Sequence, residues 1–184
     1  DFLLDLLESQ HIPIWSHQRK DHDPIVFGGG PVLTANPEPL APFLDVVLLG
    51  EGEELIPNFI SKLKEITRQS RIDRLKALAQ VPGIYIPSLY EAKYSANGKL
   101  IGIEPTESEI PTSISKQTFK GNVLSHSTVI TPAAAWPNIH MVEVVRSCPE
   151  LCRFCLASYL TLPFRTSSLG SGLIPAIQKG LTAT

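Results

Sequence analysis

The sequence of 184 residues lacks the features that mark membrane and secreted proteins. It has no run of about 18 apolar residues, the length that a membrane-spanning helix needs. Its N-terminus has no charged segment followed by an apolar core and a small-residue cleavage site, so no signal peptide is indicated. We therefore expect a protein that is not secreted and does not partner with a membrane.

An excess of charge of either sign is also missing. The 16 basic and 18 acidic side chains give a formal net charge of −2. A phosphate backbone requires a basic field, which this composition does not supply, so nucleic-acid binding is not indicated. The 43% hydrophobic and 18% charged residues are typical of a globular protein.

Cysteine is scarce and is concentrated in one place. The chain has three cysteines, Cys148, Cys152 and Cys155, in the pattern C-x3-C-x2-C. An odd number in so short a stretch does not form a disulfide framework, so we expect a reducing compartment, the cytoplasm. Three thiolates on one loop leave a tetrahedral or cubane metal centre one ligand short, which suits a metal with an open position.

Three interpretations of the cysteine loop are open from its spacing alone. An iron–sulfur cluster is favoured. The alternative is a non-catalytic binding or scaffold module with a zinc knuckle, for which His126 and His140 are the candidate fourth ligands, although neither has the usual spacing. Inert or redox-active thiols are the third interpretation. The remaining histidines are irregularly spaced in a polar stretch and are expected to be solvated: His11, His17 and His22.

Short apolar runs alternate with a helical pattern in the first half of the chain. Residues 24–27 and 45–49 are continuous apolar runs and are predicted to be buried strands of a parallel sheet. A short helix is expected between them, from Asn36 as N-cap to Phe43. Together these segments predict a βαβ unit.

Two further helices are predicted, one that opens with the acidic stretch 50–54 and one that ends at Pro82. Asn97 and Gly98 then indicate a two-residue type I′ turn in a hairpin over residues 84–104. Residues 139–145 are predicted to be the strand that leads into the cysteine loop.

The cysteine motif and its surroundings resemble the radical S-adenosylmethionine (SAM) enzymes. Phe154 stands directly before the last cysteine, and the motif follows a predicted strand, as in the signature of that family. The stretch VEVVRSCPELCRFCLASYLTLPFR is similar to the subgroup whose radical domain follows a cobalamin-binding-like Rossmann domain. Upstream, PIVFGGGPVLTANPEPLAPFLDVVLLGEGEE and VPGIYIPSLYE resemble the end of that domain and the segment that joins it to the barrel.

This resemblance implies a [4Fe-4S] cluster bound by Cys148, Cys152 and Cys155, with SAM on the fourth iron and Phe154 near the adenine. An electron donor such as flavodoxin or ferredoxin would reduce the cluster. Cleavage of SAM would then give a 5′-deoxyadenosyl radical that acts on an unknown substrate. Members of the subgroup commonly have glycine where Ser147 stands, so the backbone approach at this position is expected to differ.

A glycine run, Gly28, Gly29 and Gly30, ends the first predicted strand. In cobalamin-binding domains a glycine pair at a strand end makes room for the nucleotide tail of the cofactor. A tight strand-to-helix turn explains the same glycines, so the sequence leaves cobalamin binding undecided.

Taken together, these patterns predict an α/β chain of three parts. Residues 1–82 would be the C-terminal part of a cobalamin-binding-like Rossmann domain with a partial parallel sheet, and residues 83–138 a β-hairpin and connector. Residues 139–184 would be the first βα unit of an incomplete (β/α) radical SAM barrel that carries the cluster loop. Because the chain starts at Asp1 and ends soon after the motif, we expect a piece of a longer enzyme that is inactive alone.

Overall fold

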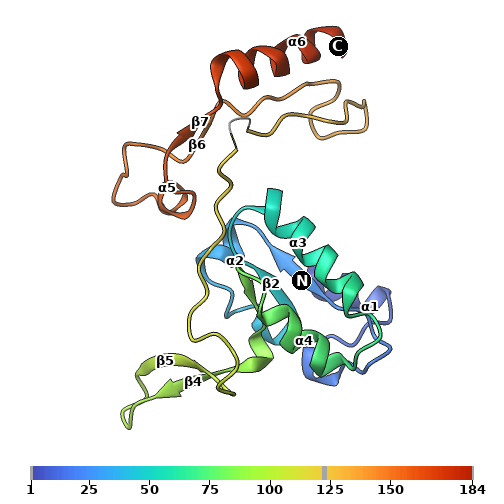
Figure 1. Cartoon of the computed structure of the whole chain (residues 1–184), viewed down its shortest axis with the longest axis vertical. Coiled ribbons are helices and arrows are strands. Elements are labelled where there is room, and N and C mark those ends of the chain that lie inside the picture. Colours follow the sequence, from blue (N-terminus) through green and yellow to red (C-terminus); the bar gives the residue numbers. More distant parts are fainter. Residues whose placement is uncertain (1, 122–123, 184) are drawn as a thin grey trace. The chain divides into compact units, whose positions relative to one another are not determined.

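Two units make up the chain, Asp1–Phe119 and Lys120–Thr184, and the computed structural model describes residues 2–121 and 124–183 (Figure 1). The first unit contains α1 (Phe2–Ser9), β1 (Phe27–Gly29), α2 (Pro31–Ala35), β2 (Val46–Leu48), α3 (Gly52–Glu65), α4 (Arg71–Ala79), β3 (Ile84–Tyr85), β4 (Tyr90–Tyr94) and β5 (Leu100–Pro105). The second unit contains β6 (Val145–Arg146), α5 (Leu156–Leu160), β7 (Arg165–Thr166) and α6 (Ile174–Ala183). Short 3-10 helices cover Ser16–Gln18, Ala41–Phe43 and Pro87–Leu89, and a π-helix covers Leu169–Leu173.

The first unit is built on a three-stranded sheet in the order β1-β2-β3. β1 is parallel to β2, and β3 is antiparallel to β2. The predicted α/β class is confirmed, and the predicted parallel pair is present. The first strand begins later than predicted, at Phe27, because the backbone N–H of Val26 donates to the Asp45 carboxylate at 2.7 Å instead of to a strand.

The helix between β1 and β2 lies earlier than predicted. It is α2, which begins after Gly30 and ends before Asn36. Gly30 has a φ of 94°, which glycine adopts readily and which turns the chain from the strand into the helix. The side-chain oxygen of Asn36 accepts the N–H of Glu38 at 3.1 Å. The N-cap prediction was wrong because asparagine favours such turns as strongly as it favours helix starts.

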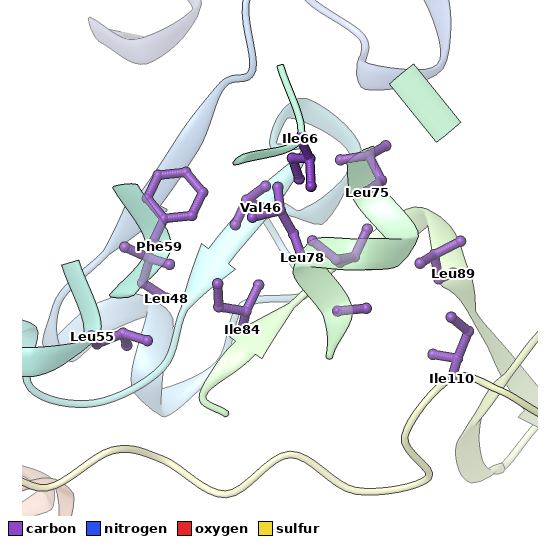
Figure 2. Packing of buried hydrophobic residues seen from close by; sticks show 12 residues of the cluster. Val46, Leu48, Leu55, Phe59, Ile66, Leu75, Leu78, Ile84, Leu89 and Ile110 are labelled. Carbon is purple, nitrogen blue, oxygen red and sulfur yellow. The ribbon is translucent and has the colours of Figure 1, made fainter. Parts of the chain in front are cut away.

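Successive side chains of a strand point to opposite faces of the sheet. Val46 and Leu48 therefore lie on one face and Val47 on the other, and both faces are covered by apolar residues. α3 and α4 cover one face with a buried apolar cluster (Figure 2), which includes Val46, Leu48, Leu55, Phe59, Leu75, Leu78 and Ile84. The opposite face is covered by residues of α1, α2 and the adjoining loop, whose cluster includes Leu3, Leu33, Leu44, Val47 and Tyr85. The predicted helices α3 and α4 are therefore confirmed, and they bury the sheet.

β4 and β5 form the predicted antiparallel hairpin, but its loop is longer than predicted. Ser95 N–H donates to Lys99 O at 2.8 Å, which leaves three loop residues instead of two. Gly98 N–H donates to Ser95 O at 2.9 Å, and the φ of Gly98 is 78°. This combination of a turn and a left-handed glycine is the usual three-residue hairpin loop. Ile84 and Tyr85, expected to belong to the hairpin, pair with β2 instead.

In the second unit, the predicted strand 139–145 is largely absent. β6 covers Val145–Arg146 and pairs antiparallel with β7, and Val142 forms a single antiparallel bridge with His126. The described residues close no barrel. Two residues of the predicted connector, 122–123, lie outside the described residues. Across the helices that the structure describes, none has both the length and the apolar character needed to cross a membrane.

Tyr85 gives the first unit a predicted dependence on alkaline pH. Its hydroxyl donates to Glu38 Oε1 at 2.8 Å, and burial, followed by this hydrogen bond and the charge of Glu38, raises the pKa of Tyr85 above its ordinary value of 10. The folded-state pKa is the higher one, so this stabilisation is complete below about pH 10 and is lost as the pH rises further. We expect the free energy of unfolding to fall more steeply above pH 10 in the wild type than in Tyr85→Phe.

Urea denaturation at a series of pH values from about 8 to 11 measures this difference in slope. Tyr94→Phe is the matched control, because the side chain of Tyr94 is 63% exposed and its removal should leave the slope unchanged. Equal slopes for the wild type and Tyr85→Phe would show that Tyr85 titrates normally.

Candidate functional site

The three cysteines lie on the segment between β6 and α5. All three thiols are free, with Cys148 and Cys152 exposed and Cys155 half-buried. Cys155 N–H donates to Cys152 O at 2.9 Å, and Cys155 is the residue directly before α5. Within the described parts of the chain, no three His, Cys, Asp or Glu side chains are grouped so that they could hold a metal ion. The structure therefore places the thiols on one loop without gathering them around a centre.

Two residues of the cysteine loop have a left-handed backbone although neither is glycine. Ser147 has a φ of 69° and directly precedes Cys148, while Leu151 has a φ of 44° and directly precedes Cys152. Such conformations cost roughly 1–3 kcal/mol each and occur most often at functional sites. Position 147 is where the family commonly has glycine, so its backbone conformation is one that glycine adopts without strain.

Hydrogen bonds to α5 hold this loop in place. Ser147 Oγ donates to Ser158 O at 2.7 Å, and the Tyr159 hydroxyl donates to Leu151 O at 2.6 Å. Each bond therefore fastens one of the two left-handed residues to the helix. The chain offsets the backbone strain with contacts that depend on α5.

The pKa of the Cys155 thiol lies below its ordinary value. Hydrogen bonds from the backbone N–H and the side chain of Ser158, with a smaller contribution from the N–H of Ala157, lower its pKa. A thiolate is the form of cysteine that binds metals and acts as a nucleophile. The start of α5 thus favours the metal-binding form of Cys155.

An ion pair fixes the approach to the loop. Arg146 donates to both carboxylate oxygens of Glu143, at 2.8 and 2.7 Å, and Ser125 N–H donates to the same carboxylate at 3.1 Å. The hydrogen bond from Arg146 is the main reason that the pKa of Glu143 lies below its usual value. In contrast to the anchored Glu143, Phe154 is 91% exposed and is not part of the apolar core.

The histidines do not join the cysteines. The rings of His126 and His140 lie edge to face with their centroids 5.8 Å apart, and His140 Nε2 lies 3.0 Å from Ala176 O in α6. Gly180 lies so close that a Cβ there would come within 2.3 Å of the His140 ring. These contacts give His140 a packing role against α6. As predicted, three histidines are exposed: His11, His17 and His22.

Packing and turn geometry explain much of the glycine run. A Cβ on Gly28 would lie 2.7 Å from Leu33 Cδ1, so its absence lets α2 pack closely on β1. A Cβ on Gly29 would lie 3.2 Å from the backbone oxygen of Leu48, and Gly30 makes the turn into α2. The strand-to-helix turn therefore accounts for Gly28, Gly29 and Gly30 without a ligand.

A buried ion network in the first unit was not predicted from the sequence. Asp45 Oδ2 lies 2.9 Å from Arg19 Nη1 and 2.7 Å from Arg71 Nη2, and all three residues are buried. The two guanidinium groups also donate to backbone oxygens of Pro13, Ile14, Phe43, Lys20, Asp23 and Pro24. This network fastens the polar stretch before β1 to the sheet. An aspartate at the head of the apolar run 45–49 was the available signal.

The donor atoms of the cysteine loop fit an iron–sulfur cluster, although the described thiols are not arranged around a common centre. Three thiols, one of them with a lowered pKa, supply the soft anionic donors that iron–sulfur clusters use. Cys148 and Cys152 are exposed, so both thiols are accessible to a bound group. The three cysteines are therefore the residues that fit this cofactor.

Two comparisons relate the chain to known proteins, one over part of the first unit and one over most of the chain. Residues 2–87 match a family described as radical SAM proteins, N-terminal, which confirms the predicted relationship to radical SAM proteins. The chain is also 28% identical over 161 residues to an uncharacterized protein of Methanocaldococcus jannaschii, in an alignment that covers 86% of this chain. The alignment covers 29% of the length of that protein. No solved structure matches the chain significantly.

Proposed function

We propose, from the match of residues 2–87 to the N-terminal region of radical SAM proteins, that the protein belongs to a radical SAM enzyme. Cys148, Cys152 and Cys155 would hold a [4Fe-4S] cluster. When bound, the cluster and SAM supply reductive cleavage of the sulfonium to give a 5′-deoxyadenosyl radical. Because the alignment covers 29% of the relative's length, the proposal names a reaction class and no substrate.

The observation that carries the proposal is the C-x3-C-x2-C motif downstream of the matched region. The cysteines at 148–155 lie outside residues 2–87, so the motif and the family match support the same function independently. Two separate segments that both indicate a radical SAM protein are stronger support than either segment alone.

The chain's own residues would serve the cluster in distinct ways. Ser158 favours the thiolate of Cys155, and Ser147 and Leu151 shape the backbone before the other two cysteines. Phe154 is exposed and available to stack on the adenine of SAM. We assign no cobalamin to the glycine run, and we infer a reducing cytoplasm with a flavodoxin or ferredoxin as electron donor.

Metal analysis after anaerobic reconstitution with iron and sulfide tests the proposal. We expect about four iron and four sulfide per chain, and an electron paramagnetic resonance signal that appears on reduction and changes when SAM is added. One tightly held zinc per chain, with no uptake of sulfide, would instead favour the zinc-knuckle module. Absence of both metals would overturn the assignment of the loop as a metal centre.

A further inference from the structure

The acidic stretch after β2 binds a segment of the chain's own connector. Gln117 N–H donates to Leu49 O at 2.9 Å, and Glu51 N–H donates to Gln117 O at 3.0 Å, so Gln117 pairs with Gly50 in a parallel bridge. Phe119 N–H then donates to Glu51 Oε2 at 2.7 Å. The segment Gln117–Phe119 is thus added to the end of β2 in the manner of an extra strand, with a charged acceptor at its end.

Two glycines make room for this segment. A Cβ on Gly50 would lie 2.2 Å from Gln117 O and 2.5 Å from Gln117 N, distances that real side chains do not reach. A Cβ on Gly83 would lie 2.4 Å from Gln117 Cγ. Both glycines also have a positive φ, of 105° and 83°. The binding slot, formed by Leu49–Glu51 and Gly83, therefore fits an extended backbone and excludes side chains.

The slot lies within the first unit and holds the last residues of that unit. Its occupant ends at Phe119, and the second unit, which carries the cysteine loop, begins at Lys120. Upstream of the slot, the connector is also held to the first unit at Ile110, which is buried, and at Pro111, whose carbonyl accepts the Tyr90 hydroxyl at 2.7 Å. Ile114 also packs against the apolar cluster that includes Leu33, Leu44, Val47 and Tyr85. Release of the slot would therefore free the five residues after Ile114, a reach of roughly 17–18 Å when extended.

We propose that the turn around Gly50 and Glu51 is a latch for the connector, which sets the reach of the cysteine-bearing unit. Glu51 is a positioning residue in this latch, because its backbone and its carboxylate both hold the segment Gln117–Phe119. The latch is independent of the proposed metal chemistry, since no cysteine takes part in it.

Limited proteolysis of the whole chain tests the latch, because Lys116 and Lys120 flank the docked segment and are trypsin sites. Glu51→Ala removes the hydrogen bond from Phe119 N–H to the carboxylate, which should raise the fraction of molecules in which Gln117–Phe119 is released. We therefore expect cleavage at both lysines to be about tenfold faster in Glu51→Ala. Gly50→Ala should have the same effect through the clash with Gln117.

Glu54→Ala is the matched control, because Glu54 is an exposed acid in the first turn of the same helix, and its cleavage rates should equal those of the wild type. Lys99 in the exposed hairpin loop provides an internal reference that should be cleaved equally in all variants. Unchanged cleavage at Lys116 and Lys120 in Glu51→Ala would overturn the latch. A rise that is equal at Lys99 would also overturn it, because that result indicates general unfolding.

Discussion

Replacement of Asp45 with asparagine is expected to lower the free energy of unfolding of the first unit by about 3–5 kcal/mol. Asp45 is the shared anion between Arg19 and Arg71, and the three side chains are 2%, 0% and 8% exposed. Asparagine keeps the shape of the side chain but removes its charge. Two guanidinium groups would then remain buried without a counter-ion.

The position of Asp45 explains why so large a loss should follow. Asp45 Oδ2 also accepts the N–H of Val26, at 2.7 Å, so one carboxylate orders the start of β1 and holds both arginines. Arg19 and Arg71 hold the stretch before β1 through backbone oxygens, and these contacts depend on the central charge. A typical domain has only 5–15 kcal/mol of net stability, so the expected loss is a large fraction.

Chemical denaturation with urea measures the effect, with Asp5→Asn as the control. Asp5 is exposed on α1, so its replacement removes the same charge without uncovering a buried partner and should change the stability by less than about 0.5 kcal/mol. Equal midpoints for Asp45→Asn and the wild type would contradict the structural role of the network.

The parts of the fold that the sequence predicted are those in which local pattern and tertiary burial agree. The apolar run 45–49 contains β2, and the apolar stripe of α3 places Leu55 and Phe59 in the core, as the pattern indicates. Ile56 and Ile60 are also apolar residues of α3, yet they are 47% and 36% exposed. The apolar pattern predicts which face of a helix can be buried. The width of the buried face depends on how much of the sheet surface the helix contacts.

The parts that were missed depend on contacts between distant residues. Gln117 pairs with Gly50 across a long separation in sequence, and Arg19 finds Asp45 in the same way. No local period marks such pairs, because the hydrogen bonds that hold them use backbone atoms and single side chains. The prediction of a strand over residues 139–145 was wrong for the same reason. A strand needs pairing partners, and these residues form one bridge, at Val142, and the short pairing of β6 with β7.

The cysteine loop was predictable in its residues and not in its geometry. The spacing predicts Cys148, Cys152 and Cys155 as the ligand set, and the family match upstream is consistent with that prediction. The left-handed backbone at Leu151 left no signal in the sequence, whereas at Ser147 the resemblance to a position that commonly holds glycine was a signal. Strain at these positions must be maintained by α5, whose contacts the spacing alone does not reveal.

Replacement of Cys152 with alanine is expected to reduce the iron and sulfide retained after reconstitution to the level of a protein-free sample. Under the proposed function the three thiols would hold the cluster, so loss of one would leave two protein ligands, too few to retain it. Cys152 is exposed, so its truncation opens no cavity and should leave the thermal unfolding midpoint unchanged. The loss would therefore report on ligation rather than on folding.

Phe154→Ala provides the control that separates ligation from SAM binding. Its ring is 91% exposed and it supplies no metal ligand, so iron and sulfide should match the wild type while the affinity for SAM falls. Stacking on an aromatic ring contributes about 1–3 kcal/mol per base. The dissociation constant for SAM should therefore be about 5- to 150-fold larger in Phe154→Ala. Retention of a full cluster by Cys152→Ala would remove Cys152 from the ligand set. Cluster loss in Phe154→Ala would mean that the loop responds to any substitution, and the two cofactor roles would no longer be separable.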